Sequence, residues 1–248
     1  MEIPKVFHQF WAGGEMPLAY RCFSQHLQDL HPDWDYILWN EESIPDLSLR
    51  YIYNYFKDNG YNQIYSVLSD LVRYEILLRE GGVWIDTDML ILKNLDPLLE
   101  DKDLLIAKQL RSEHHMSLNS CFIAAPEYHY IHDIIPTVIE SRFQEMTRKT
   151  HVLSAEDDER SRQKKMWNTN LVSTGPGMIT SVIRACVPHY EPPSIPTFHP
   201  FSMGEVVERQ LESIDSYGLH FFNCKNGSES IQIHKQLPCY EWIVNGGS

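Results

Sequence analysis

The sequence predicts a single α/β domain whose central sheet is mixed and mostly parallel. Residues 5–12 are aromatic and β-branched and run into two glycines, which predicts a first strand. Residues 18–30 have apolar side chains at helical spacing, and residues 34–39 read as a second strand. A strand–helix–strand opening is typical of a parallel, Rossmann-like sheet. At 248 residues and 29.0 kDa, the chain is long enough for one such domain.

The rest of the chain continues this pattern. The clearest helix covers residues 63–80, where leucines recur every three or four positions and a double glycine follows. A short buried strand is predicted at residues 83–85. Further strands are predicted at 104–108, 121–125 and 230–234, and further helices at 46–56, 130–148 and 178–185. We expect one domain over 1–248, with a core over 1–190 and a helical and loop tail over 191–248 that closes the site.

Composition excludes several classes of function. The formal net charge is −13, whereas a nucleic-acid-binding protein needs a basic face to neutralise phosphates. The five cysteines are scattered and odd in number, which favours a reducing compartment over a disulfide framework. There is neither a charged-then-apolar leader nor an apolar run long enough to span a membrane. We therefore expect a cytoplasmic protein that visits any membrane-bound acceptor peripherally.

One stretch is almost free of apolar side chains. Residues 154–165 contain a run of acidic residues followed by basic ones. This composition predicts a solvated loop. A mobile lid over a binding site is the functional alternative.

The triplet Asp86-Thr87-Asp88 is the main candidate for chemistry. Two carboxylates one residue apart at a strand end can hold a hard divalent cation. The spacing alone proves little, because the triplets at 33–35 and 101–103 share it. Those two lie in polar, loop-like surroundings, and we expect both to be solvated. The triplet at 86–88 differs because it follows a buried strand and a double glycine.

The helix that precedes this strand carries two charged residues. Asp70 and Arg73 are three positions apart and share one helix face, away from the leucine stripe. A surface ion pair of little energetic value is one interpretation. In the other, the arginine neutralises phosphate and the aspartate binds a sugar hydroxyl.

Together these motifs resemble a known family. Residues 69–74 (SDLVRY) and 81–88 (GGVWIDTD) are similar to the "SD-x-x-RY…GG-x-Y-x-D-x-D" core of glycosyltransferase family 32, whose pattern is shared by the catalytic domains of the large clostridial glucosylating toxins. Residues 3–11 (IPKVFHQFW), 119–126 (NSCFIAAP) and 174–176 (TGP) resemble flanking blocks of that family. The core block is highly specific, and the flanking blocks are moderately so.

The resemblance implies a GT-A fold, a retaining glycosyl transfer and a role for each matched position. Phe10 and Trp11 would lie at the nucleotide base, with Trp11 stacking on it. Asp70 and Arg73 would hold the donor sugar, and Asn119 would lie close to the reacting centre. Asp88 would ligate the metal, and Asp86 would contact the ribose or sugar side and join the metal site. Trp84 stands where the family has tyrosine and would be a further donor-binding residue, without the hydroxyl that a tyrosine would offer.

The third metal ligand in such folds comes from a C-terminal segment. His234, at the end of the strand predicted at 230–234, is our candidate, and Trp242 on the tail is a second candidate donor contact. A purely structural histidine is the alternative, since the chain has 12. Gly175 and Gly177 before a helix could bind an anion through backbone N–H groups or simply form a turn.

The sequence thus predicts a metal-dependent hexosyltransferase. We expect Mn²⁺ or Mg²⁺ as cofactor, a UDP- or GDP-sugar as donor, and a hydroxyl of a glycan or lipid-linked glycan as acceptor, as in polysaccharide biosynthesis. Two alternatives stay open: an effector that glycosylates a protein, and an inactive nucleotide-sugar-binding protein.

Overall fold

A five-stranded sheet forms the centre of the protein. The computed structural model describes residues 2–112, 115–149, 157–194, 197–198, 215–221 and 235–244. The strand order is β2-β1-β3-β6-β5, formed by β1 (Val6–Phe10), β2 (Asp35–Trp39), β3 (Gly82–Ile85), β5 (Leu105–Ser112) and β6 (His115–Ala125). β1 pairs in parallel with β2 and β3, whereas β6 runs antiparallel to β3 and β5. Four of the five strands therefore point the same way, as the predicted mixed, mostly parallel sheet requires.

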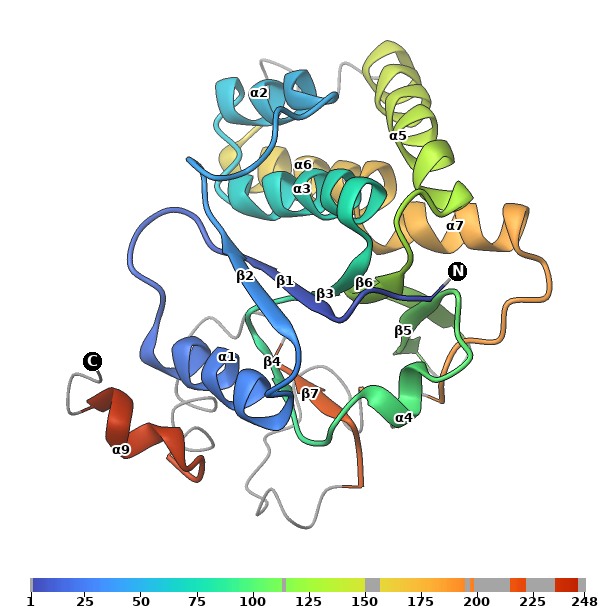
Figure 1. Ribbon diagram of the computed structural model, residues 1–248. Helices are drawn as coiled ribbons and strands as arrows, with labels where there is room; N and C mark the ends of the chain where they lie inside the picture. The colour runs from blue at the N-terminus through green and yellow to red at the C-terminus, as the bar shows by residue number, and fades with distance from the viewer. Residues whose placement is uncertain are drawn as a thin grey trace.

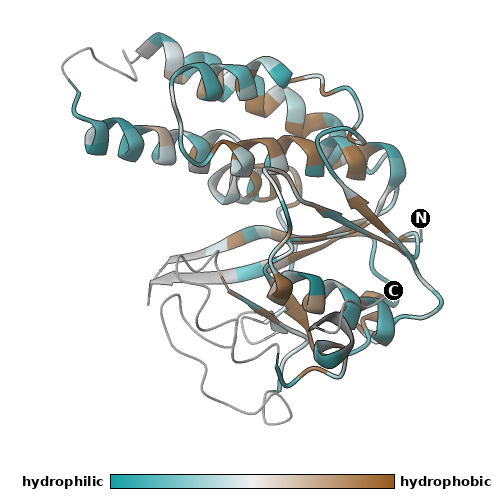
Figure 2. Cartoon of the chain, turned by 90° about the vertical axis from the view of Figure 1, so that its left-hand side faces the viewer, coloured by the Kyte–Doolittle hydropathy of each residue, from teal (hydrophilic) through white to brown (hydrophobic). Residues whose placement is uncertain are grey.

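Helices cover both faces of this sheet (Figure 1). One face is covered by α2 (Arg50–Asp58), α3 (Ile64–Glu80), α5 (Tyr130–Lys149), α6 (Glu159–Ser173) and α7 (Pro176–Cys186). Against the other face lie α1 (Leu18–Leu30), α4 (Asp96–Leu99) and a two-stranded sheet of β4 (Met89–Ile91) and β7 (Gly218–His220). α9 (Cys239–Val244) packs on α1. In Figure 2 the hydrophobic residues gather on the strands and on the helix faces turned toward them.

Strand β3 separates two hydrophobic clusters. Trp84 is fully buried among residues of α2, α3, α5 and α7. Val83 and Ile85 point to the opposite face, where they pack with Leu27 of α1 and with residues of β4. Successive side chains of a strand alternate between faces, so Asp86, two residues after Trp84, continues on the α3 side.

The double glycine before β3 is required by close backbone packing. Gly81 has φ +61°, and a Cβ there would lie 2.3 Å from the backbone nitrogen of Glu127. Gly82 has φ +88°, and its Cβ would lie 2.7 Å from the carbonyl oxygen of Val6. The carbonyl of Gly81 also accepts a 3.0 Å hydrogen bond from buried His8, whose other ring nitrogen accepts one from Trp39. These glycines bring the end of α3 against β1 and β6 and so position everything that follows β3.

Most predicted elements form, with three corrections. Residues 154–165 were expected to be a loop, but a helix begins at Glu159. The Asp158 carboxylate caps this helix by accepting a hydrogen bond from the N–H of Ser161 (2.7 Å), and Met166 anchors it because its side chain is buried against the core. The helix predicted at 46–56 runs from Arg50 to Asp58. Strands β4 and β7 were not predicted, since each is only three residues long. The strand expected at 230–234 lies outside the described residues.

We predict that Gly81→Ala destabilises the protein far more than Gly60→Ala does. Both glycines have positive φ, but a Cβ at Gly60 (φ +71°) meets nothing within 4 Å, whereas one at Gly81 meets backbone. Left-handed strain alone costs about 1–2 kcal/mol, and a steric clash with immobile backbone adds about 1–3 kcal/mol. Urea unfolding of both variants measures the difference. Equal free energies of unfolding would contradict the packing role of Gly81.

His132 of α5 has a buried imidazole ring. Its side chain is 1% exposed, and neither ring nitrogen has a partner within the described part of the chain. Its ring centroid is 6.2 Å from that of His129. Burial, reinforced by His129, lowers the pKa of His132 to about 3. His132 therefore stays neutral in the folded protein while it becomes protonated in the unfolded chain below about pH 6.5.

We predict that His132 makes the fold acid-sensitive. When the pKa of a histidine is lower in the folded state than in the unfolded state, the folded protein loses stability as pH falls from about 6.5 toward 3. The reason is that only the unfolded state takes up a proton in this range. At pH 5 this loss amounts to roughly 2 kcal/mol relative to pH 7. The variant His132→Leu should therefore show a smaller decrease in free energy of unfolding between pH 7 and pH 5. An unchanged decrease would show that His132 does not contribute.

Candidate metal and donor site

The acidic triplet lies where β3 leaves the sheet. The N–H of Asp86 donates to the carbonyl of Cys121 on β6 (2.8 Å), which is the last β3–β6 bond before the chain turns. The N–H of Met89 then donates back to the carbonyl of Asp86 (3.0 Å), forming a tight turn that contains Asp88. Both carboxylates thus stand at the C-terminal edge of the parallel strands, where α/β folds bind ligands.

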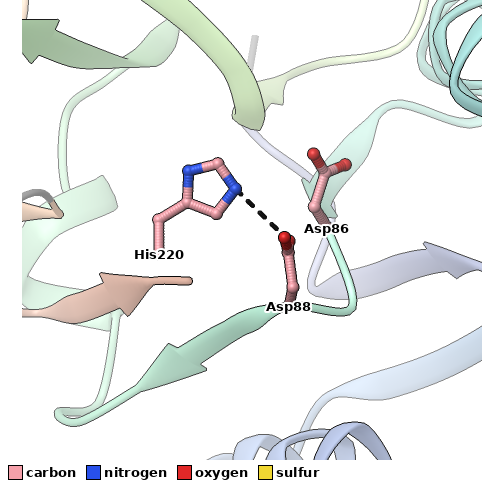
Figure 3. A group of neighbouring side chains, drawn as sticks. All are labelled: Asp86, Asp88 and His220. Carbon is pink, nitrogen blue, oxygen red and sulfur yellow. Dashed lines mark ion pairs between the residues drawn. The ribbon is translucent and has the colours of Figure 1, made fainter. Parts of the chain in front are cut away.

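A distant segment brings a histidine to this turn. β4, which starts immediately after Asp88, pairs antiparallel with β7, so that Met89 lies opposite His220. The N–H of Phe221 donates to the carbonyl of Asp88 (3.0 Å), which fixes the register. One ring nitrogen of His220 lies 3.3 Å from the Asp88 carboxylate (Figure 3). Single ligand atoms from Asp86, Asp88 and His220 all lie within 4.8 Å of one another.

This set of atoms suits a divalent cation. Two carboxylate oxygens and one imidazole nitrogen match the ligand preferences of Mn²⁺, and carboxylates also suit Mg²⁺. Burial by itself lowers the pKa of His220, but Cys121 and Asp88 oppose it and leave that pKa well above the usual range. When its imidazole is protonated, His220 forms an ion pair with Asp88. A metal ion requires the neutral imidazole, so its binding must release this proton.

His220 was not predicted from the sequence. The predicted third ligand, His234, lies outside the described residues. The only local signal for His220 is a small apolar and aromatic segment around it, residues 217–221, which is too short to distinguish from a loop. Its proximity to Asp88 is a consequence of the β4–β7 pairing, which joins segments far apart in sequence.

Arg73 links α3 to the triplet. Its guanidinium is 3% exposed, and it contacts Asp70 through Nη1 and Asp86 through Nη2, the latter at 2.6 Å. Burial disfavours the charged form of Arg73, but Asp86 and Asp70 outweigh this effect and raise its pKa, so it remains a cation. Burial raises the pKa of Asp70, and Arg73 opposes that shift. The surface ion pair considered from spacing alone is therefore wrong, because α3 is buried on this face as well.

Trp84 occupies the position of the family's tyrosine and supplies a hydrogen-bond donor there. Its indole N–H donates to Oδ1 of Asp86 (2.8 Å), the same oxygen that Arg73 contacts. The guanidinium of Arg73 lies 5.1 Å from the centre of the Trp84 ring. Trp84 is fully buried, so it orients Asp86 from within the core and does not offer a surface to a ligand.

Other predicted residues lie around the same edge of the sheet. Trp11 follows β1, is partly exposed, and donates from its indole nitrogen to the carbonyl of Gly14 (2.9 Å). The side chain of Phe10 is buried in the core instead. Asn119 lies on β6 two residues before Cys121, to whose N–H it offers Oδ1 (3.0 Å). Trp242 lies in α9, and only its backbone is described.

Two further expectations can be compared with the structure. The N–H of Gly175 donates to the carbonyl of Asn170 (3.0 Å), so this glycine forms a turn and does not present its N–H to an anion. The aspartates at 33, 35, 101 and 103 are exposed, as expected for triplets without a ligand.

An α/β sheet with a carboxylate–carboxylate–histidine group at its C-terminal edge is the arrangement expected of the predicted GT-A fold. Residues 17–105 match the family described as "glycosyltransferase sugar-binding region containing DXD motif". The match includes Asp70, Arg73 and the triplet, so the resemblance found in the motifs is confirmed.

Similar proteins agree with this assignment. The chain is 37% identical over 98 residues to inositol phosphoceramide mannosyltransferase 3 of Schizosaccharomyces pombe, a match that covers 39% of this chain and 27% of that protein. It is 39% identical over 98 residues to mannosyl phosphorylinositol ceramide synthase SUR1 of Saccharomyces cerevisiae, covering 39% of this chain and 25% of that protein. The matched segment thus spans about a quarter of the length of these relatives.

Solved structures share the fold. The PaToxG glycosyltransferase superimposes with a TM-score of 0.55 at 16% identity, covering 75% of this chain and 70% of that one. The catalytic domain of alpha-toxin from Clostridium novyi gives a TM-score of 0.50 at 10% identity, covering 73% of this chain and 72% of that one. Identities this low show the common GT-A fold and do not extend to substrates. In the described part of the chain, no helix is long and apolar enough to cross a bilayer.

We predict that His220→Ala weakens Mn²⁺ binding by about 10- to 100-fold or more. Loss of a residue that only hydrogen-bonds to a metal ligand already lowers metal affinity by that factor, and His220 would be a ligand itself. The exposed His189 provides the matched control, and His189→Ala should bind Mn²⁺ like the wild-type protein. Isothermal titration at neutral pH measures both. Equal Mn²⁺ affinity in His220→Ala and wild type would exclude His220 as a ligand.

Proposed function

We propose that this protein transfers a hexosyl unit from a nucleoside diphosphate sugar to a hydroxyl of a glycan or glycolipid, with retention of anomeric configuration. The observation that carries the proposal is the convergence of Asp86, Asp88 and His220 beside the buried Arg73. Such a group can bind the diphosphate leaving group through a cation, while Arg73 fixes Asp86.

In this proposal the protein's own residues have distinct tasks. Asp86, Asp88 and His220 would hold the cation, and the Asp86 carboxylate is oriented by its bonds to Arg73 and Trp84. When bound, the cation neutralises the charge that develops on the departing phosphate oxygen. Trp11, partly exposed at the end of β1, would stack on the base.

Retention would proceed on one face of the sugar. A double displacement needs a carboxylate free to attack the anomeric carbon. Asp70 is the remote candidate for that role, but one of its oxygens pairs with Arg73 and the other accepts from Thr174 (2.9 Å). Asp70 is thus better suited to hold the sugar. The acceptor hydroxyl would attack from the face of the leaving group and give its proton to the departing phosphate.

The relatives suggest which donor and acceptor to test first. Those reported above are named as enzymes that mannosylate inositol phosphoceramide. By analogy we propose a mannosyl donor and an acceptor hydroxyl on a glycan or a glycolipid headgroup. The toxins share only the fold, so they add no support for a protein acceptor. An inactive binding protein is disfavoured because Trp84 preserves a hydrogen bond to Asp86 in place of the family's tyrosine.

A screen of UDP- and GDP-sugars for nucleotide release with Mn²⁺ or Mg²⁺ tests the proposal. We expect release from at least one donor, and GDP-mannose is the first choice. Asp88→Asn should lower that release by roughly 100-fold or more, because the cation loses a charged ligand. Asp103→Asn, in an exposed triplet, should keep wild-type activity. Binding of donors without any nucleotide release would instead favour the inactive nucleotide-sugar-binding protein.

A further inference from the structure

The turn between α6 and α7 contacts the donor-sugar side of the site. Thr174 is the C-cap of α6, and Gly175 is the N-cap of α7, which begins at Pro176. The side chain of Thr174 is fully buried, although this residue is 104 positions from Asp70 in sequence. Nothing in the proposed chemistry requires a buried threonine at this turn, so its contacts need a separate explanation.

Two hydrogen bonds attach Thr174 to α3. Its hydroxyl donates to Oδ2 of Asp70 (2.9 Å), and its backbone carbonyl accepts from the hydroxyl of Tyr74 (3.0 Å). Asp70 and Tyr74 are one helical turn apart, so the bonds hold the α6–α7 turn against a single face of α3. The side-chain amide of Asn170 contacts the same hydroxyl through Oδ1, and its Nδ2 donates to the hydroxyl of Ser66 on α3 (3.1 Å).

The carboxylate of Asp70 is therefore held at both oxygens. Oδ1 pairs with Nη1 of Arg73, and Oδ2 accepts from Thr174. A carboxylate bonded through one oxygen can still rotate about its Cβ–Cγ bond, whereas bonds to both oxygens fix its plane. A fixed Asp70 in turn fixes Arg73, whose Nη2 reaches Asp86 at 2.6 Å.

We propose that Thr174 is a positioning residue, which acts on the donor sugar through Asp70 and Arg73 and touches no substrate itself. This inference rests on the proposed function and assigns a role to the TGP segment, residues 174–176. Its loss should impair the geometry of the sugar in the transition state and leave the grip on the diphosphate intact. The diphosphate grip belongs to the cation ligands, which Thr174 does not contact.

Three variants test the role of the hydroxyl. Thr174→Val removes it at nearly constant shape, and Thr174→Ser restores it. Thr169→Val is the matched control, because Thr169 is also buried on α6. Among the described residues, its hydroxyl bonds only the carbonyl of Lys165 in its own helix (2.9 Å). Each variant is assayed for kcat and KM of nucleotide release with the best donor. Each is also titrated with the nucleoside diphosphate that lacks the sugar, in the presence of Mn²⁺.

We expect Thr174→Val to lower kcat/KM for the donor about tenfold while its affinity for the sugar-free nucleoside diphosphate stays within about twofold of wild type. Thr174→Ser and Thr169→Val should behave like wild type in both assays.

Three results would overturn the inference while the proposed function stands: wild-type turnover in Thr174→Val, an equal loss of nucleoside diphosphate affinity, or no recovery in Thr174→Ser. The second result would mean a general structural role. If the wild-type protein itself releases no nucleotide, the proposed function fails, and the inference fails with it.

Discussion

The site depends on the buried guanidinium of Arg73. Removing an arginine from water costs several kcal/mol unless charged and hydrogen-bonding partners replace the solvent. Here Asp70 and Asp86 are these partners, and the Trp84 ring lies beside the guanidinium. The contacts that compensate for the burial of the Arg73 charge also orient Asp86, because Oδ1 of Asp86 accepts hydrogen bonds from both Arg73 and Trp84. Folding of the core and preparation of the ligand site are thus one event.

The candidate cation site is assembled differently, from two segments that lie far apart in the sequence. Asp86 and Asp88 stand on a turn after β3, but His220 arrives on β7 through pairing with β4. The turn is therefore attached both to the main sheet, through the N–H of Asp86, and to the small sheet, through the carbonyl of Asp88. This double attachment explains how a three-residue strand can hold a metal ligand in place.

Electrostatics give the acidic protein a way to bind an anion. A net charge of −13 opposes a diphosphate, yet Arg73 already balances Asp70 and Asp86 in the core. A divalent cation on Asp86, Asp88 and His220 would reverse the local charge at the edge of the sheet. The donor site would then attract a diphosphate only when the metal is bound. The metal would thus take part in substrate recognition as well as in the transfer reaction.

The sequence by itself determined the sheet, its main helices and the ligand-bearing edge. α1, α3 and β3 follow from periodicity, and the triplet at 86–88 stands out because a double glycine and a buried strand precede it. These signals are local, so a linear pattern records them. Only the tertiary structure decided that Asp70 and Arg73 are buried and that Trp84, in the tyrosine's place, donates a hydrogen bond to Asp86. It also decided that His220 lies beside Asp88 and Thr174 beside Asp70. The contacts of Arg73 with Asp86, of His220 with Asp88 and of Thr174 with Asp70 join different elements. The spacing of residues within one segment does not encode the distance between two segments.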